Sequence, residues 1–187
     1  MSEFENEYDF EENISIWSRI RWFIMGKDSP DIFTKITFYI IFVLWSIFFV
    51  WNILSLGAIS FRDTIEQEKQ IPVTEIINLR GRELGFSSDV FLNRLMIFHW
   101  VSIICWLSVF ISIILLWRKN KKFVFFFFSG TMTYFVFMIY YLSLSYYTQD
   151  TTFFDKIAFI ALNLAAIIYS LTNRANQHEN SNGFFGD

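Results

Sequence analysis

The residues that could carry acid–base or metal chemistry are few and widely separated in this chain. The histidines are His99 and His178, and Cys105 is the only cysteine. Zinc in proteins is held by three or four His, Cys or carboxylate ligands. His99 lies near the start of the second long apolar segment and His178 after the fourth, which predicts that they lie on opposite sides of a membrane. We therefore expect no metal, no cofactor and no enzymatic reaction, and interpret His99 as a structural residue at the membrane interface.

Arg94 and His99 form an Arg-x4-His spacing that resembles the pair found in HEPN-type ribonucleases. Five residues correspond to about 140° of rotation on a continuous helix, so the two side chains diverge. The apolar Leu95 directly follows the arginine, where that pattern usually has a polar residue. The pair is also expected on the non-cytoplasmic side, where no cellular RNA is found. These points disfavour a nuclease, and the few basic residues predict no direct binding of nucleic acid.

Small and hydroxyl-bearing residues recur at helical spacing in the apolar segments. Inside lipid, helices associate through close packing of small residues and through interhelical hydrogen bonds. Two such faces on one helix imply two neighbours, which belong either to the same chain or to another subunit. The sequence predicts helix packing or an oligomer interface, or a pore lined by hydroxyls, at Ser102, Cys105, Ser108, Ser112, Ser129, Thr133, Ala158, Ala161, Asn163, Ala165, Ala166 and Ser170.

Four long apolar segments carry these residues. The chain has 187 residues, of which 54% are hydrophobic, and 25 are Phe. A hydrocarbon core of ~30 Å is crossed by about 20 apolar helical residues. The segments run over about 36–57, 95–117, 123–146 and 153–171. A soluble bundle is disfavoured because its helices would each show a polar face. We predict an all-α membrane protein with a four-transmembrane-helix bundle between residues 33 and 172.

Polar motifs predict where the helices begin. Ser29 with Pro30 suits an N-cap and first helical position, the run from Ser87 to Asp89 starts a helix before the second span, and Thr152 with Asp155 resembles a capping box.

Three segments lie outside the spans. Residues 1–32 are predicted to form an acidic cytoplasmic tail and an interfacial amphipathic helix. Residues 58–93 are predicted to form a small extracytoplasmic cap with helices over 60–70 and from Pro72, interrupted by Gly81 and Gly85. Residues 173–187 form a polar cytoplasmic tail that we expect to be irregular.

Lys and Arg in the short loops predict the orientation. Cytoplasmic loops carry an excess of these residues, and the loop between the third and fourth spans holds only Lys156. This predicts a cytoplasmic (inner) membrane protein with both termini in the cytoplasm. The cations expected at lipid headgroups are Arg19, Arg21, Lys27, Lys35, Arg118, Lys119, Lys121 and Lys122.

The middle of the spans lacks the ionisable residues that transporters and membrane enzymes retain. We therefore expect a non-enzymatic, self-associating membrane module that acts as an envelope sensor or anchor and couples to a cytoplasmic protein partner. The alternatives are an oligomeric channel gated by dewetting and an accessory subunit of a larger membrane complex. In its four-span architecture the chain resembles the membrane component of Kiwa-type defence and the four-span accessory protein of Cas13b-type CRISPR loci. That resemblance implies a role in bacterial anti-phage defence.

Overall fold

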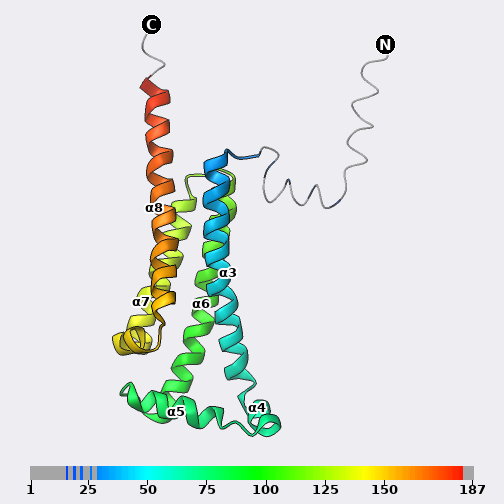
Figure 1. Ribbon diagram of the computed structural model, residues 1–187, viewed down its shortest axis with the longest axis vertical. Coiled ribbons are helices and arrows are strands. Elements are labelled where there is room, and N and C mark those ends of the chain that lie inside the picture. The colour runs from blue at the N-terminus through cyan, green and yellow to red at the C-terminus, as the bar shows by residue number, and fades with distance from the viewer. Residues whose placement is uncertain (1–15, 17–18, 20–21, 23–25, 27–28, 183–187) are drawn as a thin grey trace.

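The computed structural model describes residues 16, 19, 22, 26 and 29–182 (Figure 1). In this part of the chain the fold is all-helical, as predicted, with no strand. Four helices are long and apolar enough to cross a membrane. They are α3 (Ile32–Ser60), α6 (Ser88–Trp117), α7 (Phe123–Gln149) and α8 (Phe153–Asn182), and the two short helices are α4 (Arg62–Lys69) and α5 (Val73–Glu83).

The four long helices lie side by side, with α6 in the centre. α6 packs along α3 and α7, whereas α8 packs mainly on α3 and meets α7 over a short stretch. Figure 1 shows α4 and α5 across one end of the bundle, and at the other end the last turns of α8 project beyond the start of α3. The core contains the stacked rings of Phe48 and Trp106, 4.9 Å apart, and a hydrogen bond of 2.7 Å from Trp45 Nε1 to the Trp106 carbonyl.

Large apolar side chains also cover the outside of the bundle. Trp51, Ile104 and Phe125 are 65%, 66% and 70% exposed. A helix that is apolar all round suits a lipid surrounding, because water would penalise this outer surface. The distribution of side chains therefore supports membrane crossing by the same four helices.

The start of α3 differs from the prediction. Asp31 is the N-cap, and its carboxylate accepts hydrogen bonds from the Thr34 backbone at 3.0 Å and the Thr34 hydroxyl at 2.8 Å. Ser29 and Pro30 precede the helix, so the predicted Ser29 cap was wrong. Asp31 prevails because its carboxylate also forms an ion pair of 2.6 Å with Lys119 in the loop after α6.

Two predicted helix starts are confirmed. α6 begins at Ser88 with Ser87 as its N-cap. At α8 the Thr152 N–H donates to Asp155 at 2.9 Å and the Asp155 N–H donates to the Thr152 hydroxyl at 3.1 Å, which is a reciprocal capping box.

The predicted cap helices are present. Contrary to the prediction, Gly81 does not interrupt α5. It is buried inside α5, and a Cβ there would lie 2.6 Å from Phe91 Cβ of α6. Glycine therefore permits close packing of two helices at this point. Gly85, with φ +87°, follows the end of α5.

The structure bears on the predictions for both ends of the chain. The expectation of an irregular tail was wrong for residues 173–182, because α8 continues to Asn182. Of the predicted interfacial helix, Ile16, Arg19 and Trp22 are described and helical. Arg21, Lys27 and the remaining residues of that segment lie outside the described residues.

Candidate functional site at the break in α7

α7 is interrupted at Ser143, which the sequence did not predict. Ser143 has φ 82° and ψ 159°, a conformation that costs a residue other than glycine about 1–3 kcal/mol. The Ser143 hydroxyl accepts a hydrogen bond of 3.3 Å from the Tyr146 N–H, as an N-cap does. The break thus begins a new short helix over 144–149, which we call the turned segment. Figure 1 shows its coil nearly end-on at the lower left, so it runs across the bundle axis.

Arg94 of α6 holds the chain just before the break. Its Nη1 donates to the Tyr141 carbonyl at 3.1 Å, and its guanidinium lies 5.2 Å and 5.5 Å from the ring centres of Phe86 and Tyr141. The non-helical backbone at Ser143 disturbs the helical hydrogen bonds around it, and Arg94 supplies a charged donor there.

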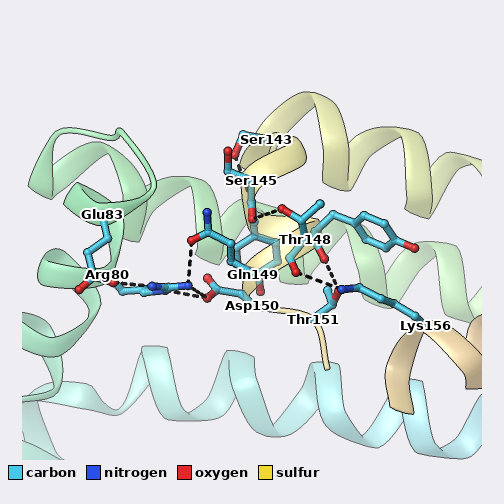
Figure 2. Close-up of polar contacts among 11 residues, drawn as sticks. Arg80, Glu83, Ser143, Ser145, Thr148, Gln149, Asp150, Thr151 and Lys156 are labelled. Atoms are coloured by element: carbon cyan, nitrogen blue, oxygen red, sulfur yellow. Dashed lines mark hydrogen bonds and ion pairs between the residues drawn. The ribbon is translucent and has the colours of Figure 1, made fainter. Parts of the chain in front are cut away.

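Arg80 of α5 and Lys156 of α8 hold the far end of the turned segment (Figure 2). Arg80 forms an ion pair of 2.6 Å with Asp150 and also contacts Glu83 and Gln149. The hydrogen bonds to Asp150 and Glu83 raise the Arg80 pKa above its ordinary value. Lys156 Nζ donates to the Thr148 carbonyl at 3.1 Å, one of the carbonyls left unpaired at a helix end. Cations from three different helices therefore bracket the break.

A small pocket lies beneath the turned segment, between α3, α7 and α8. Its apolar lining comes from aromatic rings and one methionine, and its polar lining from the start of α8 and the end of α7. The lining residues are Phe48, Tyr134, Phe135, Met138, Tyr147, Thr151, Asp155, Lys156 and Phe159.

A buried polar pair lies inside the bundle near the same end. His99 Nδ1 and Asn52 Oδ1 are 3.0 Å apart, and the residues are 5% and 2% exposed. Asn52 also donates to the Phe48 carbonyl at 2.8 Å and interacts with Tyr134. His99 is therefore enclosed by the protein and pairs with a residue of α3, and its predicted depth at the membrane interface stays a prediction. Its partner Asn52 was missed, although a lone amide in an apolar segment signals an interhelical hydrogen bond.

Arg94 and His99 have separate partners on α7 and α3. A nuclease pair would need both groups at one substrate, so their placement gives no support to that resemblance.

The small face of α6 lies within the chain. Ser108 donates to the Phe126 carbonyl of α7 at 3.2 Å, and a Cβ on Gly130 would lie 2.8 Å from the Cys105 carbonyl oxygen. Ser102 and Ser112 are buried and bond to carbonyls of α6 itself. The part of α6 that bears Cys105 and Ser108 therefore packs on α7, and Ser102 and Ser112 are enclosed by the chain.

The other small residues divide into inward and outward sets. Ala158 and Ala166 are buried, whereas Ala161, Ala165 and Ser170 are half-buried. Ser129 and Thr133 are exposed on α7.

Asn163 forms no hydrogen bond to another helix in the described part of the chain. Its amide nitrogen donates to the Phe159 carbonyl of its own helix at 2.8 Å. Its buried Oδ1 has no hydrogen-bond partner among the described residues. A bond to a helix of another subunit stays a prediction.

Most of the predicted headgroup cations are accessible. Lys119 pairs with Asp31 and Lys35 is half-buried. The exposed members among the described residues are Arg19, Arg118, Lys119, Lys121 and Lys122.

No group of three or more His, Cys, Asp or Glu able to hold a metal occurs among the described residues. Comparisons of the chain with protein-family models, with curated proteins and with solved structures gave no match.

Proposed function

We propose that the chain is a non-enzymatic membrane module that senses a change at the α4–α5 end of the bundle and passes it to a cytoplasmic protein partner. The observation that carries this proposal is the strained break at Ser143, bracketed by Arg80, Arg94 and Lys156 from three helices. A signalling protein needs an element with two arrangements of similar free energy, and a strained backbone held by a few polar contacts is such an element.

A movement at the break can be passed along α7 to the other end of the bundle. The helical part of α7 before the break runs without interruption from the basic loop over 118–122, and it packs on the central α6. At the loop, Lys119 contacts Asp31 at the start of α3, and Thr34 on the next turn bonds with Tyr169 of α8 at 3.2 Å. A shift of α7 would therefore change the contacts of α3 and α8 at the end of the bundle where the exposed basic loop is accessible to a partner.

An oligomeric channel is the second candidate. The exposed hydroxyls of Ser129 and Thr133 on α7 are the feature that favours it, because side chains on that face meet other subunits in an oligomer. The architectural resemblance to membrane components of Kiwa-type and Cas13b-type systems adds anti-phage defence as the setting in which either module would act.

The coupling is tested with a reporter cysteine at position 121, introduced as Lys121→Cys in a Cys105→Ala background and labelled in membranes with an impermeant maleimide. Both Ser143→Gly and Ser143→Ala remove the hydroxyl that caps the turned segment. Ser143→Gly also removes the backbone strain and so favours the break, whereas Ser143→Ala keeps the strain. We expect the two variants to change the labelling rate in opposite directions, and Ser129→Gly, on the exposed face of the same helix, to leave it unchanged. An unchanged rate in both Ser143 variants would overturn the coupling.

The orientation is tested separately. A reporter active only in the cytoplasm should work after Asp187 and fail within residues 64–70. The reverse result would place the basic loop outside the cytoplasm and remove the proposed partner.

A further inference from the structure

We infer that the pocket beneath the turned segment binds one zwitterionic aminophospholipid, whose acyl chain enters between α7 and α8 and whose phosphate lies at Lys156. This inference rests on two parts of the proposed function, namely that the four helices cross a membrane and that the turned segment is the part that moves.

The pocket walls suit hydrocarbon. Phe135 stacks on Phe159 of α8 with ring centres 5.8 Å apart and meets Tyr147 of the turned segment edge-on at 5.4 Å. Phe48 and Met138 complete the apolar lining. The pocket is half open, and ligand sites combine an apolar wall of this kind with a few polar groups at one edge.

The pocket adjoins a surface that a membrane would cover with acyl chains. α7 and α8 contact each other over a short stretch only, so the two helices do not seal this side along their length. Val136 and Ile160, the neighbours of pocket residues Phe135 and Phe159, are 61% and 56% exposed. Apolar side chains exposed on the outside of both helices therefore lie next in sequence to pocket residues.

Lys156 provides the contact for a phosphate. An ammonium group has three donors, and one of them is used on the Thr148 carbonyl. The ring of Tyr147 lies 5.3 Å from Nζ and shields the cation on one side. The remaining donors suit a phosphate oxygen, which forms short charge-assisted hydrogen bonds with ammonium groups.

Asp155 distinguishes between headgroups. Its Oδ2 accepts hydrogen bonds from the Thr152 backbone and hydroxyl, and the carboxylate lines the same pocket as Lys156. A headgroup with only negative charge would meet this carboxylate as well as the lysine. A phosphoethanolamine headgroup can place its phosphate against Lys156 and its ammonium against Asp155, so charge complementarity favours the zwitterionic lipid.

Occupancy would act on the break. A phosphate bound at Lys156 would draw the ammonium group away from the Thr148 carbonyl, and that contact is one of those that hold the far end of the turned segment. The lipid would thus shift the balance between the two arrangements by its different affinity for each.

The test is retention of added lipid by the full chain in detergent, measured by native mass spectrometry. The probes have matched acyl chains and carry phosphoethanolamine, phosphoglycerol or phosphocholine headgroups, and chain-free glycerophosphoethanolamine reports on headgroup binding alone. We expect phosphatidylethanolamine to be retained best and the chain-free compound not at all. Lys156→Gln should lower retention about tenfold, the effect of losing one charge-assisted hydrogen bond. Lys121→Gln, in the exposed basic loop, is the matched control.

A second measurement covers the case in which a variant does not fold. A photoreactive group at the end of the acyl chain should cross-link the unmodified protein at pocket residues such as Met138 or Phe159. Any of four results would overturn the lipid site. These are equal retention of all headgroups, equal loss in the Lys121→Gln control, binding of the chain-free compound, and cross-links confined to Phe125 on the outer surface of α7. If the protein shows no lipid selectivity but the two Ser143 variants still change the labelling rate in opposite directions, only the lipid site is refuted. If the protein retains lipid selectively but the Ser143 variants do not change the labelling rate, the proposed function is refuted and the lipid site stands.

Discussion

The Arg80 guanidinium lies 2.6 Å from the carboxylate of Asp150, the residue that directly follows α7. The next residue of α5, Gly81, is the point where α5 touches Phe91 of α6. Two consecutive residues of a short helix therefore fix it to two different long helices. This arrangement makes α5 a bridge across the end of the bundle at which α7 breaks.

Removing either side of the bridge should loosen α5 without unfolding the bundle. In Arg80→Gln and in Asp150→Asn we expect faster amide hydrogen exchange over residues 73–83, because the ion pair is the polar link between α5 and the end of α7. The double variant should exchange no faster than the single variants. The control is Arg82→Gln, a change at an exposed neighbour. Faster exchange in the control, or additive effects in the double variant, would contradict the bridge.

Gly81→Ala should be destabilising although alanine favours helices. The added Cβ would lie 2.6 Å from Phe91 Cβ, and such overpacking costs about 1–3 kcal/mol. Gly57→Ala in α3 is the matched control, because its Cβ meets nothing within 4 Å and should stabilise by about 0.5–1 kcal/mol. Thermal unfolding in detergent measures both. Equal effects of the two substitutions would show that α5 does not press on α6 at this point.

His99→Leu should cost about 1–3 kcal/mol, because it leaves the buried Asn52 oxygen without its partner. His99→Gln keeps an amide donor in reach and should cost less. The double variant His99→Leu with Asn52→Leu should recover part of the loss, since both polar groups are then removed. Free energies of unfolding in detergent and a double-mutant cycle give the coupling, and additive losses would argue against a direct bond.

The sequence predicted the four apolar helices well because membrane thickness sets their length and lipid allows few alternatives to a helix. Caps within one turn, such as Thr152 with Asp155, were also predictable, since the partners are three residues apart. The Asp31 cap was missed because its advantage comes from Lys119, which is distant in sequence. The break at Ser143 was missed for a similar reason. No glycine or proline marks it, and Arg94, Arg80 and Lys156 reach it from other helices.

Asp31 should make stability depend on acid pH. The bond to Lys119 holds the pKa of this carboxyl well below its usual range, with further help from Thr34. A depressed pKa contributes stability above the unfolded value of about 4 and loses it as pH falls toward the folded value. The unfolding temperature of the unmodified chain should therefore exceed that of Asp31→Asn at pH 7, and the difference should shrink below about pH 4. Because the side chain is half exposed, the difference will be modest.

Self-association is best tested on α7. The α6 residues predicted at an oligomer interface are used inside the chain, and Ala165→Leu would disturb the core beside it. Ser129 and Thr133 are exposed one turn apart, so they are the predicted residues that a second copy can reach without rearrangement. Thr133→Leu should lower the dimer fraction in cross-linking and native mass spectrometry several-fold, because a bulky side chain keeps two backbones apart. Met132→Leu, at a neighbouring exposed position, should leave that fraction unchanged. An unmodified chain that is monomeric in lipid nanodiscs, or equal effects of the two variants, would remove the oligomer and with it the channel, because the exposed hydroxyls of one chain do not enclose a pore.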